Sequence, residues 1–281
     1  MPDLTLTLIQ TDLAWEDIDA NLARLTAKIE SIAAPTDLIV LPEMFSTGFS
    51  MSAPRLAETV AGKAAAWMRR MAAAGGAVVT GSLMIQESGH YYNRLIWARP
   101  DGAIEHYDKK HLFRYAGEEK VFTAGARLMT FALKGWRIRP FICYDLRFPV
   151  WTRNLRQSYD LALFVANWPA RRSAHWQALL RARAIENQAY AIGVNRVGTD
   201  GNGLYYNGCS AVIAPTGEVL LEEIQNERIC TLSLDRGLLE SYRKEFPVWM
   251  DADEEMILGK EHFDTEDHPG GNESFSYGDP K

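Results

Sequence analysis

Apolar and polar residues alternate at the start of the chain, where Leu4, Leu6 and Leu8 are separated by threonines. Alternation with a period of two is typical of a β-strand with one buried face. Apolar residues then recur every three or four positions from Ile18 to Ile32, which predicts a helix with one apolar stripe. The next run, DLIVLPE, has an unbroken apolar stretch from Leu38 to Leu41, as in a strand that is covered on both faces.

The alternation of strands and helices continues along the chain. An alanine-rich helix is expected over 61–74, followed by the strand AVVTGSLMI and by two β-rich runs around the turn sequence PDG. A short helix is expected after FICYD, and DLALFVANW predicts another strand. A long helix should then run from about Ser173, its expected N-cap, to Tyr190. The strand AIGVNRVG, the hairpin SAVIAPTGEVLLEE and the strand ICTLSLD complete the pattern.

This order of elements predicts a mixed α/β fold whose sheet faces are covered by helices. We expect one domain over 1–235, because no linker, repeat or low-complexity segment interrupts that stretch. Residues 236–281 are expected to form a C-terminal extension. Its last part is rich in Gly, Asp, Glu and Ser, which predicts a poorly packed polar tail.

Composition narrows the class of protein. Of the 281 residues, 47% are hydrophobic and 23% are charged, as in ordinary globular proteins. The net charge of −6 gives no basic surface for nucleic acid, and no apolar run approaches the ~18 residues of a membrane span. The N-terminus lacks the features of a signal peptide, and three cysteines cannot all pair, so we expect a cytoplasmic protein. No metal-ligand spacing is present, and no metal or cofactor is expected.

Two candidate catalytic residues stand at the ends of predicted strands. Glu43 follows an apolar strand, where α/β proteins place their ligand sites; a helix-capping or surface glutamate is the alternative. Cys143 ends the strand in FICYD, and the chain turns directly after it. Such turns expose a nucleophile beside free backbone N–H groups. A buried, inert thiol explains the same position equally well.

The segment HYDKKHLFRYAGEE carries a second group of candidates. Strand alternation places Lys109 and His111 on one side of the run. Both lysines of the KK pair could instead be solvated residues of an edge strand. His111 is more readily explained as a hydrogen-bonded structural histidine than as a base. Glu118 and Glu119 follow in a loop, where a surface position is the simpler interpretation.

Four fragments in this order, LPEMFSTGF, YDKKHLF, ICYDLRFP and ANWPARRSAHW, resemble the motifs of the nitrilase superfamily of carbon–nitrogen hydrolases. The resemblance extends from about residue 3 to about 235. NWPARR and AIENQAYAIGVNRVGTDGNG are most similar to the ω-amidase branch. The resemblance implies a four-layer α-β-β-α sandwich and a homodimer or larger homo-oligomer.

The family uses a Glu-Lys-Cys triad, and its motifs match this sequence position by position. They imply Glu43 as the general base, Lys109 as the lysine and Cys143 as the nucleophile. Of the two adjacent lysines, Lys109 is chosen because the family pattern places one residue between lysine and histidine. An auxiliary glutamate is assigned to Glu118, with Glu119 as the alternative.

The activity implied by the resemblance is hydrolysis of the ω-amide of a small 2-oxo acid, such as 2-oxoglutaramate, to the dicarboxylate and ammonia. The reaction would pass through a cysteine acyl-enzyme. Another small-amide hydrolase or an N-carbamoyl-amine hydrolase of the same superfamily is the alternative enzyme. An inactive scaffold with the same fold is the alternative outside the enzymes, although the complete triad argues against it.

Substrate-binding residues are expected near the triad. Arg172 is the candidate for the substrate carboxylate, because a guanidinium binds carboxylates in a bidentate fork; a solvated arginine or an internal ion pair is the alternative. The backbone N–H near Tyr144 should contact the oxyanion. Arg147 is expected to be structural and to pair with an Asp or Glu that holds the turn. Residues of the pocket wall, or of the core, are expected at Phe45, Trp168 and His175.

Overall fold

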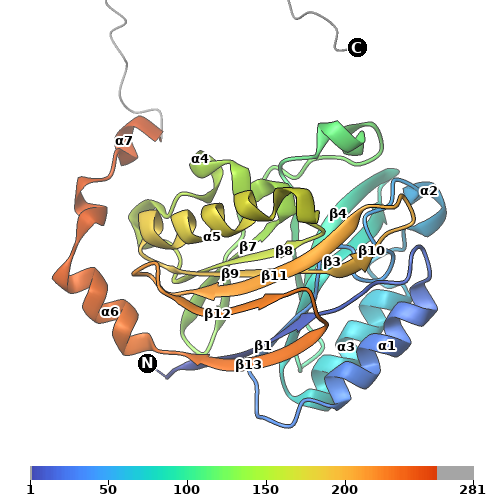
Figure 1. Cartoon of the computed structure of the whole chain (residues 1–281), viewed down its shortest axis with the longest axis horizontal. Coiled ribbons are helices and arrows are strands. Elements are labelled where there is room, and N and C mark those ends of the chain that lie inside the picture. Colours follow the sequence, from blue (N-terminus) through green and yellow to red (C-terminus); the bar gives the residue numbers. More distant parts are fainter. Residues whose placement is uncertain (1, 258–281) are drawn as a thin grey trace, which may run out of the picture.

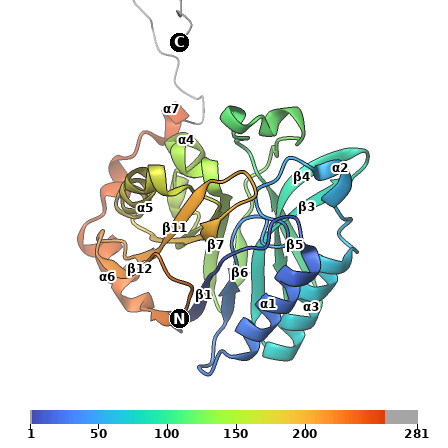
Figure 2. The same cartoon turned by 45° about the vertical axis from the view of Figure 1, so that its right-hand side comes forward.

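Two β-sheets packed face to face form the centre of the structure, and helices cover the outer face of each sheet (Figure 1 and Figure 2). This computed structural model describes residues 2–257. The expected tail at the end of the chain lies outside the described residues. None of the described helices is long and apolar enough to cross a membrane.

The first sheet has the strand order β13-β1-β2-β3-β4-β5. Strands β1, β2 and β3 are parallel, and the other neighbours are antiparallel. The strands are β1 (Leu4–Gln10), β2 (Leu38–Val40), β3 (Val78–Glu87), β4 (His90–Ala98), β5 (Ile104–Asp108) and β13 (Arg228–Leu234).

The second sheet has the order β10-β11-β9-β8-β7-β6, with β12 paired to β11. Strands β7, β8 and β9 are parallel. The strands are β6 (Phe131–Leu133), β7 (Trp136–Ile142), β8 (Leu161–Ala166), β9 (Tyr190–Asn195), β10 (Val197–Thr199), β11 (Tyr205–Ile213) and β12 (Val219–Ile224). Most of these segments match the runs predicted from the apolar pattern.

A shared apolar core lies between the two sheets. Leu4, Leu6 and Leu8 point into it from β1, and Leu163 and Val165 contribute from β8. The period-two alternation at the N-terminus therefore reflects one face of β1 turned toward the second sheet.

Separate apolar clusters join each sheet to its helices. Helices α1 (Ile18–Glu30) and α3 (Lys63–Gly75) pack on the first sheet, and α5 (Ser173–Asn187) packs on the second. Figure 2 shows α1 and α3 on one side of the molecule and α5 on the opposite side. This arrangement confirms the expected four-layer α-β-β-α sandwich.

Shorter helical segments complete the described chain. They are α2 (Ala53–Leu56), α4 (Pro149–Thr152), α6 (Arg236–Glu245) and α7 (Glu254–Ile257), with the 3-10 turns η1 (Arg114–Ala116), η2 (Glu118–Lys120), η3 (Cys143–Arg147), η4 (Leu155–Gln157), η5 (Ala170–Arg172) and η6 (Val248–Asp251). Three of the turns, η1, η3 and η5, carry residues that line the site described below.

The start of α5 differs from the expectation. Arg172, not Ser173, is the N-cap residue, and no side chain caps the helix there. The hydroxyl of Ser173 lies 2.8 Å from the carbonyl oxygen of Ala170 and 2.7 Å from Oδ1 of Asn207. The serine oxygen therefore ties η5 to β11 and does not accept from the first turn of the helix.

Helix α6 follows the expected domain boundary at residue 235 and packs against the folded part of the chain. Its Leu239 is fully buried in the core between the sheets. Its Arg243 donates to Asp160 and to the backbone carbonyls of Tyr159 and Gln188. The division at 235 stays a prediction, but residues 236–245 are well packed.

Candidate active site

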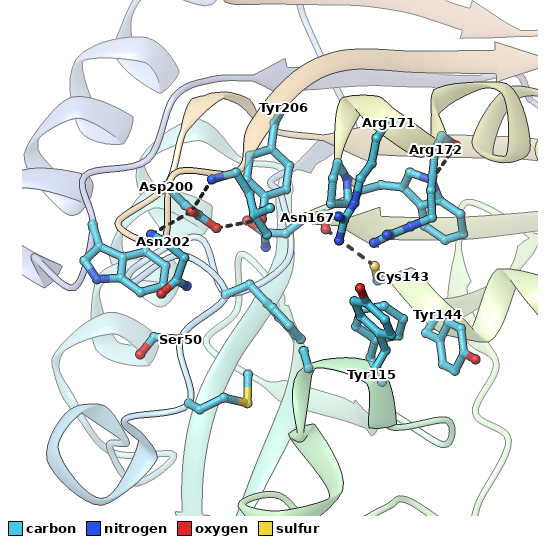
Figure 3. A pocket seen from close by; sticks show the side chains of 18 of the residues that line it. Ser50, Tyr115, Cys143, Tyr144, Asn167, Arg171, Arg172, Asp200, Asn202 and Tyr206 are labelled. Atoms are coloured by element: carbon cyan, nitrogen blue, oxygen red, sulfur yellow. Dashed lines mark hydrogen bonds between the residues drawn. The ribbon is translucent and has the colours of Figure 1, made fainter. Parts of the chain in front are cut away.

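The chain makes a sharp turn at Cys143. Strand β7 ends at Ile142, and η3 begins at Cys143 with a φ of +45°, in the left-handed region. Non-glycine residues in this region are strained, and such residues are concentrated at functional sites. The side chain of Cys143 is partly exposed and lines a cavity of about 590 Å³ (Figure 3). The thiol is therefore accessible from the cavity.

Lys109 lies between two carboxylates. Its Nζ is 2.8 Å from Oε1 of Glu43 and 2.9 Å from both oxygens of Glu118, and all three side chains are fully buried. Oε2 of Glu43 accepts from the backbone N–H of Asn167 at 2.8 Å. The carbonyl oxygen of Asn167 is 3.9 Å from Sγ of Cys143. The structure thus brings together the four residues that the resemblance had assigned to catalysis.

These residues come from both sheets. Glu43 follows β2 and Lys109 follows β5 in the first sheet, whereas Cys143 follows β7 and Asn167 follows β8 in the second. The site therefore lies where strand ends of the two sheets meet, which is a common location for ligand sites in α/β folds.

Of the two neighbouring glutamates, Glu118 is the one that contacts the lysine. It begins η2, and its Oε2 also accepts from the backbone N–H of Phe113 at 2.6 Å. Glu119, the alternative considered from the sequence, is only half-buried.

A buried amide that the sequence did not reveal fixes both carboxylates. Nδ2 of Asn93, in β4, donates to Glu43 at 2.8 Å and to Glu118 at 3.2 Å. The hydroxyl of Ser82 donates to Oδ1 of Asn93 at 2.8 Å and accepts from the backbone N–H of Met44. Asn93 lies in an otherwise ordinary strand sequence, so no local pattern marks it.

The charges of the site determine the protonation states. Burial raises the pKa of the Cys143 thiol well above its usual value; Glu43 raises it further, and Lys109 opposes this. Burial alone would lower the pKa of Lys109, but the carboxylates of Glu118 and Glu43 outweigh it and raise that pKa. Burial raises the pKa of Glu118, and Lys109 counteracts part of the shift. The resting site therefore holds a neutral thiol beside a protonated lysine.

Asp145 rigidly holds the turn that carries Cys143. Its fully buried carboxylate accepts from the Tyr107 hydroxyl at 2.7 Å and from the backbone N–H of Ile142 at 3.0 Å. It also accepts from the backbone N–H of His111 at 2.9 Å and lies 2.8 Å from Nδ1 of that ring. His111 is thus a hydrogen-bonded structural histidine, as the sequence suggested.

Three of the five predicted substrate-site residues line the cavity, namely Tyr144, Trp168 and Arg172. Phe45 and His175 are absent from the described residues that line it. Phe45 is fully buried in the core, with its ring 5.7 Å from that of Trp67. His175 lies at the surface, where Nδ1 is 3.0 Å from a guanidinium nitrogen of Arg147.

Contrary to the expectation, no Asp or Glu among residues 2–257 forms an ion pair with Arg147. Its guanidinium lies 4.9 Å from the centre of the Trp168 ring, and it lines the cavity. Asp145, the carboxylate nearest in sequence, already accepts from Tyr107, Ile142 and His111. Because Tyr107 and His111 are distant from Asp145 in the sequence, local sequence could not show that its carboxylate accepts from them.

Further residues of the cavity wall were not predicted. They come from loops that the fold brings together from distant parts of the chain, and include Trp15, Ser50, Phe113, Tyr115, Arg171, Asp200, Asn202 and Tyr206. Arg171 could have been noticed from its position beside Arg172; the other residues carry no local signal.

The geometry suits acyl transfer. A thiol lies beside a carboxylate that can accept its proton, and an ammonium group is held where negative charge can develop. A cavity with an arginine on its wall opens onto the thiol.

Comparisons with known proteins match nearly the whole described chain. A family model for carbon-nitrogen hydrolases matches residues 5–244. Omega-amidase YafV of Escherichia coli strain K12 is 48% identical over 256 residues, covering 90% of this chain and 98% of the relative. The 2-oxoglutaramate amidase of Bacillus subtilis strain 168 is 32% identical over 256 residues, with the same coverage. A solved CN-hydrolase superfamily protein of Xanthomonas campestris, with an arsenic adduct in its active site, has a TM-score of 0.88 and 44% identity over 90% of this chain and 98% of its own.

Proposed function

The chain belongs to the carbon-nitrogen hydrolase family and is an amidase, and from this premise we propose that it hydrolyses the ω-amide of small 2-oxo acids such as 2-oxoglutaramate. The products would be the dicarboxylate and ammonia. The observation that carries the proposal is the contact of Lys109 with both Glu43 and Glu118 beside the thiol of Cys143. The names of the relatives, omega-amidase and 2-oxoglutaramate amidase, support the choice of substrate.

In the first step, Sγ of Cys143 attacks the carbonyl carbon of the amide while Glu43 takes the thiol proton. The high pKa of the thiol means that this proton leaves during the attack. The resulting oxyanion lies near the ammonium of Lys109 and the backbone N–H of Tyr144. Glu43 then passes the proton to the amide nitrogen, the carbon–nitrogen bond breaks, and ammonia departs from a thioester.

In the second step, a water molecule attacks the thioester. Glu43 accepts a proton from the water while the water oxygen bonds to the carbonyl carbon of the thioester. Glu43 then gives this proton to the departing sulfur of Cys143. The acid leaves and the thiol is restored. Glu118 holds Lys109 in position throughout, since both of its oxygens lie 2.9 Å from Nζ.

Arg172 is the proposed binding residue for the substrate carboxylate. It lines the cavity, and within residues 2–257 no Asp or Glu forms an ion pair with it. Its guanidinium lies 5.3 Å from the centre of the Phe113 ring. In this position the N–H groups at the edge of the guanidinium plane can donate to a ligand carboxylate. Substrates of another class, such as N-carbamoyl amines, are the alternative. A cytoplasmic location and a homodimer or larger homo-oligomer belong to the same proposal.

Ammonia release from a panel of amides tests the function. We expect 2-oxoglutaramate to be hydrolysed with a higher kcat/KM than simple aliphatic amides, N-carbamoyl amines or nitriles. Arg172→Ala should lower kcat/KM for 2-oxoglutaramate by roughly 10- to 100-fold, because a charge-assisted hydrogen bond contributes about 1.5–3 kcal/mol. The same variant should leave hydrolysis of a simple aliphatic amide nearly unchanged, since that amide has no carboxylate.

Arg172→Lys is the matched variant, and it should restore little of the activity because lysine lacks a planar fork. Equal losses on both kinds of amide would show that Arg172 supports the loop and does not bind the substrate. Preference for carbamoyl compounds over all ω-amides would contradict the proposed substrate class.

A further inference from the structure

Three guanidinium groups line the cavity beside the nucleophile, contributed by Arg147, Arg171 and Arg172. We call them the arginine cluster. Each packs on an aromatic ring: the guanidinium carbons lie 4.9, 5.8 and 5.3 Å from the ring centres of Trp168, Tyr115 and Phe113, respectively. Across residues 2–257, none of the three forms an ion pair with a carboxylate. No carboxylate of the described residues therefore neutralises these charges by direct contact.

The acidic side chains on the cavity wall are already occupied. Glu16 pairs with Arg55 and accepts from the hydroxyl of Ser50. Asp200 accepts from the Tyr206 hydroxyl and from two backbone N–H groups of its own loop. In Figure 3, Arg171 and Arg172 lie on the same side of the cavity as Cys143, whereas Ser50, Asp200 and Asn202 lie on the other. Among the described residues that line the cavity, both carboxylates are therefore hydrogen-bonded to other groups, and Asp200 lies across the cavity from the cluster.

The three positive charges are close enough to affect one another. Burial lowers the pKa of Arg172, and the charges of Arg171 and Arg147 lower it further. A bound anion relieves this repulsion, whereas a second cation adds to it.

From this arrangement we infer that the arginine cluster excludes substrates that carry an ammonium group, and so separates the ω-amides of 2-oxo acids from those of α-amino acids. The inference rests on the proposed function and names the discrimination made at the same site. Glutamine has the same carbon skeleton, carboxylate and ω-amide as 2-oxoglutaramate and differs only at C2, where an ammonium replaces the ketone. When Arg172 holds the carboxylate, C2 lies next to the cluster.

The arginine cluster should favour a ketone at C2 and disfavour an ammonium there. A ketone oxygen is neutral and can accept a hydrogen bond from a guanidinium. An ammonium offers only donors and adds a positive charge to three others. Of these, Arg147 and Arg172 are half-buried, where charge interactions are less screened than in water, and Arg171 is exposed. Specificity of this kind comes from repulsion of the wrong ligand and not only from attraction of the right one.

Four ω-amides that differ only at C2 distinguish the effect of charge on hydrolysis from the effect of shape. They are 2-oxoglutaramate, 2-hydroxyglutaramate, glutaramate and glutamine. For the unmodified enzyme we expect glutaramate and the hydroxy compound to be hydrolysed with similar kcat/KM. Glutamine should be poorer than glutaramate by about 100-fold or more, as expected for an added like charge at close range. The readout is the ratio of kcat/KM for glutaramate to that for glutamine, because the effect of the shared carboxylate cancels in it.

Arg171→Gln should lower this ratio by about tenfold, since one of the repelling charges is removed. Arg147→Gln should act in the same direction. Arg114→Gln is the matched control, because Arg114 is an exposed arginine of η1 that is not among the described residues lining the cavity; it should leave the ratio unchanged.

A ratio that stays the same in both cluster variants, or that changes equally in Arg114→Gln, would overturn the inference. If no ω-amide is hydrolysed, the proposed function is wrong, and the inference is then judged by binding to the Cys143→Ala variant. Calorimetry with glutaramate and glutamine should still show tighter binding of glutaramate. Equal affinities would overturn the inference as well.

Discussion

At the scale of the residue, the reactivity of Cys143 is set by opposing charges. Burial raises the pKa of the thiol, Glu43 raises it further, and Lys109 lowers it. The proposed base therefore makes the thiolate less stable while it offers a place for the proton. Such a site keeps the nucleophile neutral until a substrate arrives, which limits side reactions of the thiolate.

Glu43→Gln should separate these two effects. The substitution keeps the shape of the side chain but removes the negative charge next to the thiol, so the pKa of Cys143 should fall. Alkylation of Cys143 by a small haloacetamide should then follow a pH profile displaced to lower pH. Turnover should nevertheless drop by about 10² or more, because proton transfer is lost. Peptide mapping of the alkylated protein and a rate assay measure the two quantities.

Glu119→Gln is the matched control and should change neither the alkylation profile nor the turnover. A Glu43→Gln protein that folds normally and turns over at the unmodified rate would exclude Glu43 as the base. Alkylation of Cys209 with full inactivation, while Cys143 stays unmodified, would exclude Cys143 as the nucleophile.

At the scale of the element, helix α6 is joined to the start of β8 through one buried carboxylate. Asp160 is fully buried and lies 2.8, 2.9 and 3.0 Å from guanidinium nitrogens of Arg137, Arg243 and Arg236. Burial opposes its ionisation, but the hydrogen bonds from Arg137 outweigh this and lower the pKa of Asp160 to about 2. The carboxylate thus compensates part of the charge of three arginines, two of which belong to α6.

This contact should make stability depend on pH in the acid range. The pKa of Asp160 is lower in the folded than in the unfolded protein. Its ionised carboxylate therefore contributes to the free energy of unfolding above pH 3.8, and this contribution is lost as the pH falls to about 2. Its size is about 2 kcal/mol, from the difference between the two pKa values. Asp160→Asn should lower the free energy of unfolding by about 3–5 kcal/mol at neutral pH, because it removes the carboxylate that pairs with the buried Arg243, whereas Arg236 keeps its ion pair with Glu240.

Denaturant titrations of the unmodified protein and of Asp160→Asn at pH 7 and at pH 3 measure these free energies of unfolding. The difference in free energy between the two proteins should be smaller at pH 3 than at pH 7. Asp19→Asn, at an exposed ion pair, is the control and should have little effect at either pH. A difference that is the same at both pH values would show that Asp160 acts by packing alone.

The elements themselves could largely be predicted from the sequence, because the apolar periods of two and about 3.6 are local properties. The residues proposed for the triad could be located from the sequence because each stands in a motif at a strand end. Two local predictions failed for a shared reason: the hydroxyl of Ser173 contacts Asn207, and Asp145 is occupied by Tyr107 and His111. Contacts between residues so distant in sequence are determined by the topology of the fold. The same holds for the part of the cavity wall that Asp200 and its loop contribute.

At the scale of the whole molecule, the two sheets share one apolar core, so we expect them to unfold together. Leu163→Ala, in the middle of β8 and fully buried in that core, should lower the free energy of unfolding by about 2–5 kcal/mol. Scanning calorimetry should still show one transition, with equal calorimetric and van't Hoff enthalpies.

Leu220→Ala is the control, because Leu220 is 39% exposed on β12 and its loss should change stability by less than about 0.5 kcal/mol. Two separate transitions in Leu163→Ala would show that each sheet and its helices form an independent unit.

The division of the site between the sheets has a consequence for the newly made chain. Glu43 and Lys109 are synthesised before Cys143 and Asn167, and the first sheet is complete only when β13, at residues 228–234, takes its place beside β1. A misplacement of about 1 Å between reacting groups can reduce a rate about 10²-fold. A nascent or partly folded chain should therefore not hydrolyse amides. Hydrolysis should begin only after the two sheets have packed against each other, so the appearance of activity reports the assembly of the site from both sheets.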